Sequence, residues 1–416
     1  MTVRLFCAGS NARDQLSTGD TEDKHTFTQA LGLRSNISRI LNVSGGSNHT
    51  LVLLEIIDET GTTSIELWGC GDGRRGQLGS SLVDDTWTTL QHIELDLEQH
   101  DLRGYTVRLA SASWETSYLV LSCPGKSDIL LSMGSNDYGD LGTGSPKSDS
   151  ENSHAVQPVG LDDLFSDEDR GCTRITRVAT GLHHVLVLLE IGRKKQPFVV
   201  GWGMSRHGQL GHGTSTSSRL PPYVSTPCIV ALDPSLGRVT SASLGHHHTV
   251  LLHENGQLTA LGSNRKGQLR SLEQWGDIHS LDCSWNGTYV VVGREDGLHI
   301  LSAGDNSKGQ LGFRSSSDMF VQFPFTPATH RLLDMACGSE HVLCLFQARS
   351  APSDDWSDRS PTEVWGWGWN EHGNLGLGNT EDSPVPVKIW PSQSAPGGNV
   401  KAIWAGCATS WIAVER

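Results

Sequence analysis

The stretch GDGRRGQL at residues 71–78 begins with a glycine, carries a second glycine at its sixth position and ends in leucine. Its pattern, G-x-N/D-x-x-G-x-L, occurs seven times with few departures, at steps of 62, 63, 69, 59, 42 and 64 residues. Such self-similarity is the sequence signature of a repeat architecture. The copies are GSNARDQL from Gly9, GDGRRGQL from Gly71, GSNDYGDL from Gly134, GMSRHGQL from Gly203, GSNRKGQL from Gly262, GDNSKGQL from Gly304 and GWNEHGNL from Gly368.

A short strand pattern precedes each copy. Bulkier, mostly apolar residues stand three and one positions before the first glycine, and a small residue stands between them, as in Trp68, Gly69 and Cys70. Alternation with period two is typical of a β-strand. The small residues give this strand one cramped face, which predicts that it packs close to an axis shared by the repeats.

A second pattern, G-x-x-H followed by an apolar run, alternates with the first. Its histidines are one per repeat, which predicts a structural hydrogen bond that holds each turn. The alternative is a metal site, but adjacent residues on a strand point to opposite faces, so we do not expect His246 and His247 to converge on one ion. The repeated histidines are His49, His184, His248 and His341, and the three copies without histidine are SWETSYLVL (113–121), SWNGTYVVV (284–292) and GCATSWIAV (406–414).

Turns with hairpin chemistry, such as HENGQ at 253–257, separate each G-x-x-H strand from the next G-x-N strand. Seven such hairpins without a helical period predict an all-β fold, a seven-bladed β-propeller that forms one domain over residues 1–416. The sequence starts with half a hairpin and finishes with the other half. We therefore expect the N- and C-terminal strands to share one blade and close the ring, which removes the open edges.

Three segments depart from the regular spacing. The 42-residue step from Gly262 to Gly304 predicts a blade that lacks outer strands, or one with strands that the repeat pattern does not mark. Residues 145–170 and 349–361 are rich in Ser and Asp, and we interpret both as acidic surface insertions.

Composition and motifs exclude several classes of function. With 32 Lys plus Arg and 46 Asp plus Glu, the net charge of −14 argues against direct nucleic-acid binding and against an anionic membrane surface. No apolar run is long enough to cross a membrane. Nine scattered cysteines without a recognisable signal peptide predict reduced thiols and a cytoplasmic and nuclear location. No nucleophile elbow, P-loop, zinc spacing or HExxH motif occurs, so we expect no enzyme activity, no cofactor and no bound metal.

Both kinds of loop should lie on one face of the ring, because a hairpin enters and leaves at the same end. On this face, departures from the repeat indicate where function lies. Trp114 and Trp285 follow the first residue of their turns, and tryptophan is favoured at binding hot spots; the alternative is that these rings fill interfaces between blades. The predicted partner-binding residues are Trp114, Glu115, Trp285, Arg74, Arg75, Trp369, Glu371 and His372.

The seven G-x-L signatures and a repeat length of roughly 60 residues resemble the regulator of chromosome condensation repeat family over nearly the whole chain. This resemblance implies a seven-bladed propeller with about four strands per blade. The stretches CGDGRRGQL (70–78), SWETSYLVL, WGWGWNEHGNLG (365–376) and GCATSWIAV resemble the fungal alpha-tubulin suppressor subgroup, which is associated with Elongator. The stretch from residue 365 also resembles the secretion-regulating, exchange-factor-like propellers of animals.

The subgroup resemblance implies a non-enzymatic scaffold that binds the small CSL-type zinc protein, with Elongator as a further partner. That zinc protein serves Elongator-dependent modification of wobble uridine in tRNA and diphthamide synthesis on elongation factor 2. Two other functions stay open. Guanine-nucleotide exchange on a small GTPase rests on family analogy alone, and the sequence has no obvious long inserted β-wedge. Chromatin binding is disfavoured by the acidic balance and by an amino terminus with only Arg4 and Arg13 in its first twenty residues.

Overall fold

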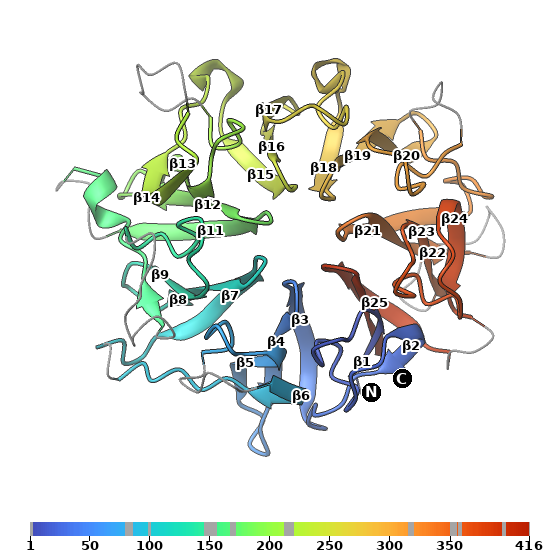
Figure 1. The fold of residues 1–416 in the computed structure, drawn as a ribbon, viewed down its shortest axis with the longest axis horizontal. Helices are drawn as coiled ribbons and strands as arrows, with labels where there is room; N and C mark the ends of the chain where they lie inside the picture. Colours follow the sequence, from blue (N-terminus) through green and yellow to red (C-terminus); the bar gives the residue numbers. More distant parts are fainter. Residues whose placement is uncertain are drawn as a thin grey trace.

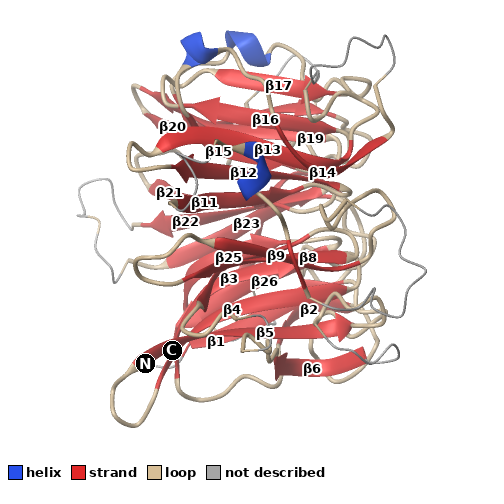
Figure 2. Ribbon diagram, turned by 90° about the vertical axis from the view of Figure 1, so that its left-hand side faces the viewer, coloured by secondary structure: helices blue, strands red, loops and turns tan. Residues whose placement is uncertain are grey.

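The strands in the described part of the chain form seven separate antiparallel sheets, which stand around one axis like the blades of a propeller (Figure 1). Viewed from the side, the molecule is a thick disc, and its few short helices lie at the periphery (Figure 2). The seven-bladed, all-β fold predicted from the sequence is confirmed. The computed structural model describes residues 3–79, 86–98, 101–144, 156–166, 172–211, 220–314, 320–349, 356, 360–392 and 397–415.

We number six blades in chain order and call the seventh the closing blade. Blade 1 contains β3 (Ile37–Gly45), β4 (His49–Ile57), β5 (Thr63–Asp72) and β6 (Thr86–His92). Blade 2 contains β7 (Thr106–Ala112), β8 (Thr116–Ser122), β9 (Ile129–Gly134) and β10 (Gln157–Pro158). Blade 3 contains β11 (Thr173–Thr180), β12 (His184–Ile191), β13 (Gln196–Met204) and β14 (Tyr223–Ile229).

Blade 4 contains β15 (Val239–Leu244), β16 (His248–His253) and β17 (Leu258–Gly262), and blade 5 contains β18 (Ile278–Cys283), β19 (Gly287–Arg294) and β20 (Gly297–Gly304). Blade 6 contains β21 (His330–Cys337), β22 (His341–Ala348), β23 (Thr362–Gly368) and β24 (Ser383–Trp390). The closing blade contains β1 (Val3–Gly9), β2 (Lys24–Gln29), β25 (Asn399–Ala405) and β26 (Thr409–Glu415). The short 3-10 helices are η1 (Asp162–Leu164), η2 (Pro234–Leu236) and η3 (Leu272–Gln274).

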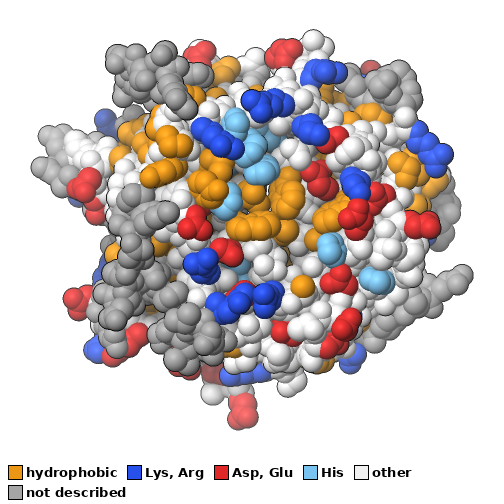
Figure 3. All heavy atoms as spheres, viewed as in Figure 1, with side chains coloured by type: hydrophobic (Ala, Val, Ile, Leu, Met, Phe, Trp, Pro, Cys, Tyr) orange, Lys and Arg blue, Asp and Glu red, His pale blue; other side chains and the backbone are white. Residues whose placement is uncertain are grey.

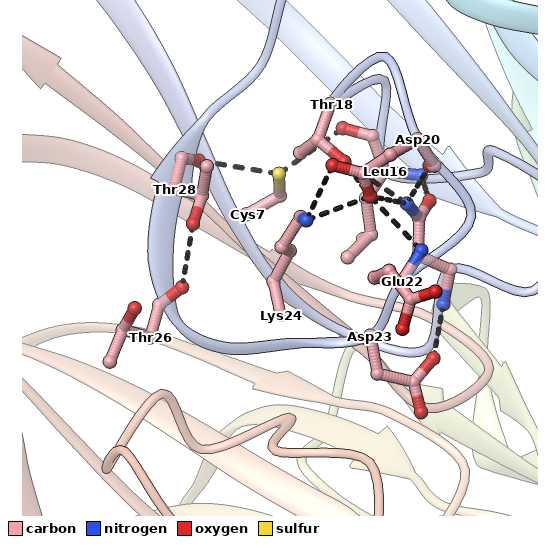
Figure 4. A network of polar contacts seen from close by, with 10 residues as sticks. Cys7, Leu16, Thr18, Asp20, Glu22, Asp23, Lys24, Thr26 and Thr28 are labelled. Atoms are coloured by element: carbon pink, nitrogen blue, oxygen red, sulfur yellow. Dashed lines mark hydrogen bonds and ion pairs between the residues drawn. The ribbon is translucent and has the colours of Figure 1, made fainter.

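The closing blade joins the two ends of the chain. β1 pairs antiparallel with β26 from Val3↔Glu415 to Gly9↔Thr409, while β2 and β25 flank this pair. The segment that leads into β2 is held by side chains: Lys24 Nζ lies 2.7 and 2.8 Å from the two carboxylate oxygens of Asp20 (Figure 4). The prediction that one blade contains both termini is confirmed.

The order of strands from the axis outward differs from our expectation. The innermost strands are β25, β3, β7, β11, β15, β18 and β21, which contact one another around the axis (Figure 1). Each G-x-N strand is third from the axis in its blade, so the prediction that it packs near the axis is wrong.

The cramped face of the third strand has another cause. The final leucine of the G-x-L motif folds back onto it: a Cβ added at Gly69 would lie 2.8 Å from Leu78 Cδ2 and from Ile93 Cδ1. Gly201 and Leu210 repeat this contact in blade 3. A small residue is therefore needed where the loop leucine and the fourth strand converge.

Blades 4 and 5 each have three strands among the described residues. The expectation that the 42-residue step shortens a blade is confirmed. In blade 5 a single bridge, Leu301↔Phe320, lies beside the third strand, whereas in blade 4 the chain continues into η3.

The two acidic stretches fall mostly outside the described residues. Within 145–170, residues 156–166 are described, and they form β10 and η1 with Val159 and Leu161 buried. The interpretation as a surface insertion is wrong for Gln157–Pro158, which form the fourth strand of blade 2, and for Val159 and Leu161, which pack into the core. Within 349–361, the described Arg349 guanidinium lies 4.6 Å from the ring centroid of Trp356.

Candidate protein-interaction surface

The G-x-N loops are held by their own motif residues. In the five loops whose third residue is asparagine, its side-chain oxygen accepts the N–H of the eighth residue, as in Asn370 Oδ1 and Leu375 N at 2.8 Å. The first glycine adopts a positive φ, 94° at Gly71, where a Cβ would lie 2.4 Å from the carbonyl oxygen of Asn48. Because the motif residues supply this framework, the fourth and fifth residues of each loop are free to vary.

The G-x-x-H turns depend on contact between the glycine and the histidine. A Cβ at Gly46 would lie 2.3 Å from His49 Cε1, and Gly181, Gly245 and Gly338 are equally close to their histidines. Each imidazole Nε2 is bonded to a hydroxyl of the following blade, at 2.9 Å for Ser117, 3.0 Å for Thr249, 3.3 Å for Thr288 and 3.0 Å for Ser410. The predicted structural hydrogen bond is confirmed, and it joins neighbouring blades.

Burial determines the protonation of these histidines. It lowers the pKa of His49, His248 and His341 to about 4, and that of His184 to about 3. Ser117 Oγ donates to the carbonyl oxygen of Gln77 at 2.7 Å, so the imidazole of His49 must donate its Nε2 proton to that hydroxyl. A neutral Nε2–H tautomer satisfies this geometry.

The turns and loops share one face of the disc, which we call the loop face, as predicted; for example, His49 at the start of β4 pairs with Gly71 at the end of β5. At its centre lies a hollow rimmed by apolar side chains (Figure 3). This hollow is the mouth of an axial channel with two cavities of about 180 and 570 Å³. Asp282 lines both, and its carboxylate joins three blades by accepting Ser243 Oγ and Cys337 N, each at 2.8 Å.

Trp114 and Trp285 meet at the mouth of the channel, with ring centroids 6.0 Å apart at an interplanar angle of 53°. They come from blades 2 and 5, which are three steps apart and so as distant as two blades of seven can be. Backbone bonds fix both turns: Trp285 N–H donates to Ser339 O at 2.8 Å, and Trp114 O accepts Ser47 N–H at 2.8 Å. Both residues are half-buried and lie outside the cores between blades.

Aromatic and imidazole rings extend this pair across blades 2 to 4. His183 lies 6.4 Å from Trp114, and Tyr138 lies 4.4 Å from His183; His246 lies 6.1 Å from Trp285. Figure 3 shows histidines gathered on this side of the hollow. Sequence reasoning missed these residues as site candidates, although His183 and His246 fill variable positions of the turns.

The rings of His246 and His247 lie 3.7 Å apart. The expectation that adjacent histidines point apart is wrong here, because both lie in the turn before β16 and not within the strand. Burial, followed by repulsion from neighbouring histidines, lowers the pKa of each to about 4. Two neutral imidazoles, tilted by 30° to each other, therefore lie together, and the ring of His246 lies beside Trp285.

Among the described residues, no group of three or more His, Cys, Asp or Glu side chains is placed to hold a metal ion. None of the helices in the described part of the chain has the length and apolarity to cross a membrane.

Arg74, Arg75 and Glu115 lie on the loop face apart from the central ring contact. Arg74 pairs with Asp72 in its own loop, with Nη2 2.6 Å from Oδ2. Arg75 is exposed, and its backbone N–H donates to Gln77 Oε1 at 2.9 Å. Glu115, next to Trp114, is half-buried, and its carbonyl accepts Ser135 N–H at 2.8 Å.

The loop after β23 carries the remaining predicted residues. Trp369 packs edge-on to His372 at 5.3 Å, and His372 Nδ1 lies 2.7 Å from Asp23 Oδ2 of the closing blade. Glu371 forms an ion pair with Lys308 of blade 5. This group links three blades, and its charged side chains already have partners within the chain. The structure thus brings Trp114 and Trp285 together and places Trp369, Glu371 and His372 in a separate cluster.

Comparison with known proteins agrees with the repeats described above. The model of the Regulator of chromosome condensation (RCC1) repeat matches residues 199–252 and 363–412. The chain carries RCC1 repeats. Each matched segment contains one copy of the loop motif: the first lies in blades 3 and 4, and the second lies in blade 6 and the closing blade. The match covers two of the seven copies of the loop motif.

Several known proteins are similar to this chain over nearly the whole of its length. The mouse "Secretion-regulating guanine nucleotide exchange factor" is 27% identical, over 97% of this chain and 81% of its own. The Arabidopsis thaliana "Ultraviolet-B receptor UVR8" is 26% identical, over 95% and 79%. An RCC1 repeat-containing protein of Schizosaccharomyces pombe is 26% identical, over 99% of both chains.

Two solved structures share the fold. Human WBSCR16 superposes with a TM-score of 0.73 at 19% identity, covering 100% of this chain and 99% of its own. Prp20p from Saccharomyces cerevisiae superposes with a TM-score of 0.72 at 19% identity, covering 100% and 92%. At this identity the likeness concerns the propeller alone.

Proposed function

We propose that this RCC1-type propeller is a non-enzymatic scaffold that binds another protein through the centre of its loop face. The observation that carries the proposal is the contact between Trp114 and Trp285 at the channel mouth. Two large rings from distant blades are held there by backbone bonds, half-exposed and unused by the cores. Tryptophan on a rigid scaffold offers a large contact area at little entropic cost, which is the composition of an interaction hot spot.

The partner we propose is the small CSL-type zinc protein, with Elongator as a further partner. The support is the likeness of SWETSYLVL and GCATSWIAV to the fungal alpha-tubulin suppressor protein. Through this partner the propeller would support wobble-uridine modification of tRNA and diphthamide synthesis, in the cytoplasm and the nucleus. Any zinc ligands belong to the partner in this scheme.

Titration of the full chain with the purified zinc protein, followed by calorimetry, tests the proposal. We expect a one-to-one complex with a Kd in the micromolar range or below. The double variant Trp114→Ala and Trp285→Ala should weaken binding at least about tenfold, since hot-spot tryptophans typically contribute 2 kcal/mol or more. Trp87→Ala, which removes a half-buried tryptophan from the outer strand β6, is the matched control. Absence of a complex at micromolar concentrations defeats the choice of partner, and unchanged affinity of the double variant removes the tryptophans from the interface.

The second candidate function is guanine-nucleotide exchange on a small GTPase. The observation that favours it is the 27% identity to the mouse exchange factor over 97% of this chain. All the described strands belong to the seven blades, so the described residues offer no separate β-hairpin to act as a wedge. Release of a fluorescent nucleotide from a panel of GTPases decides between the two, because a scaffold leaves the release rate unchanged.

A further inference from the structure

Blade 4 leaves its third strand uncovered. The small residue at the centre of the third strand is buried in six blades, and its equivalent in β17, Ala260, is exposed. The loop leucine that should pack there, Leu269, is only half-buried, whereas the other six loop leucines are buried. The six buried small residues are Cys7, Gly69, Ser132, Gly201, Ser302 and Gly366. The difference follows from the missing fourth strand.

The backbone of β17 is open at the same place. The bond from His253 N–H to Gln257 O at 2.9 Å fixes which residues of the β16–β17 hairpin form hydrogen-bonded pairs. The backbone N–H and C=O groups of Thr259 and Leu261 therefore point toward β16. Leu258 and Ala260 must then direct their N–H and C=O groups outward. Among the described residues, no backbone group bonds to either of them, and η3 packs nearby without pairing to the strand.

The equivalent of Leu258 accepts a hydrogen bond in other blades. Its carbonyl oxygen receives a backbone N–H from the segment that follows, or continues, the fourth strand. These bonds join Ala30 to Leu5 at 2.9 Å, Ile93 to Leu67 at 2.8 Å, Val159 to Leu130 at 2.8 Å, Val230 to Val199 at 2.8 Å and Val321 to Ile300 at 2.9 Å. In blade 6 the same position, Val364, is paired with Trp390 of β24. Blade 4 is the exception.

We propose that the outer edge of β17 binds an extended segment of a partner protein, which adds to blade 4 as its fourth strand. The chain itself indicates the chemistry of this segment. Each donor of the carbonyl bond is apolar, and in three blades an apolar residue three positions earlier and a leucine two positions later accompany it: Leu90-x-x-Ile93-x-Leu95, Val156-x-x-Val159-x-Leu161 and Pro227-x-x-Val230-x-Leu232. Ile93 and Val230 fill the space beside the small residue. The segment should therefore read apolar-x-x-apolar-x-Leu.

Strand addition supplies affinity through main-chain bonds and specificity through the pockets for alternate side chains. The apolar floor of the site is in place, since Leu272 and Trp275 are buried in the core between blades 4 and 5, where Leu258 and Leu269 pack against them. This site lies at the circumference of the ring, away from the tryptophan pair, and it does not depend on the partner proposed for the loop face.

A synthetic peptide that copies residues 87–96, WTTLQHIELD, serves as the probe. Its binding to the full chain is followed by fluorescence anisotropy, and backbone protection by hydrogen exchange. We expect saturable binding, with slower exchange at the amides of Leu258 and Ala260. The Ile93→Asp version of the peptide should bind at least tenfold more weakly, because a carboxylate would enter the apolar space.

Two substitutions at one position isolate the backbone contribution. Ala260→Ser keeps the outward N–H and matches Ser132 and Ser302, so its affinity should stay within twofold of the parent. Ala260→Pro removes an N–H that β16 does not use, which a sheet edge tolerates, and it should weaken binding at least tenfold. Equal affinity of Ala260→Ser and Ala260→Pro would show that the peptide does not bind the outward N–H of residue 260. Protection of β5 in place of β17 would show that the peptide displaces β6. Either result would overturn the proposal. Absence of binding to the parent chain at millimolar peptide also overturns it, whether or not the zinc protein binds.

Discussion

Mild acid should destabilise this propeller because four buried histidines resist protonation. Burial holds the pKa of His49, His248 and His341 at about 4 and that of His184 at about 3 in the folded state. In the unfolded chain an imidazole returns to its ordinary value of about 6.5. Protons therefore bind more readily to the unfolded state, and the free energy of unfolding falls as the pH drops from 6.5 toward 4.

The size of the effect follows from the same values. Between pH 7 and 5.5, a histidine whose pKa falls from about 6.5 to about 4 on folding loses about 1.2 kcal/mol of its stabilising contribution. Four such residues lose about 5 kcal/mol together, which is a large fraction of the roughly 5–15 kcal/mol that stabilises a typical domain. Stability should be level above pH 7 and should decline steeply below pH 6.

Urea unfolding followed by tryptophan fluorescence at pH 7.0 and 5.5 measures this difference. His49→Thr, which introduces the residue found at Thr116 and Thr409, should reduce the pH-dependent loss by about 1.2 kcal/mol, although the variant is less stable at pH 7. His279→Thr, at an exposed imidazole, should leave the loss unchanged. Equal stability of the parent at the two pH values, or an identical loss in His49→Thr, would refute the linkage to these buried rings.

Three further predictions concern stability at neutral pH, each measured by urea unfolding. Gly46→Ala places a Cβ 2.3 Å from His49 Cε1 and should cost about 2–4 kcal/mol; adding His49→Thr should recover part of this cost, and strict additivity would contradict the contact. Leu78→Ala should cost about 3 kcal/mol and Leu269→Ala about 1 kcal/mol, because only Leu78 is buried beneath a fourth strand; equal costs would contradict the open edge of blade 4. Lys308→Ala should leave the free energy of unfolding unchanged within experimental error, since its ion pair with Glu371 is exposed, and a measurable loss would assign the pair a structural role.

The sequence predicted the blades because two motifs mark the second and third strand of each one. It did not reveal the innermost strands, since β3 and β7 carry no shared motif, and their identity depends on contacts between blades. The cramped face of the third strand was visible in Gly69 and Gly201, but its cause was assigned wrongly. Only the fold places Leu78 and Leu210 against these glycines, because the motif must turn back on itself to do so.

The candidate site was predictable in part for a similar reason. Trp114 and Trp285 were conspicuous as departures from the repeat, but their contact requires blades 2 and 5 to face each other across the axis. The sequence analysis assigned His246 and His247 to a strand, whereas the structure places them in the turn directly before β16. Pairings such as His372 with Asp23 join residues at opposite ends of the chain, which only ring closure brings together.

The two tryptophan turns also lack the glycine–histidine contact, and this coincidence has a structural explanation. All three turns without histidine carry a large buried aromatic residue two positions later, namely Tyr118, Tyr289 and Trp411, where the histidine turns carry Leu or Val. Tyr118 and Tyr289 donate their hydroxyl protons to loop carbonyls at 2.7 and 2.8 Å, so a buried side chain still fixes the neighbouring loop. With the loop held in this way, the turn no longer needs its glycine and histidine, and Ser113 and Ser284 stand where the histidine turns have glycine. The residue that follows this serine is variable in all seven turns, and in these two turns it is the tryptophan at the channel mouth.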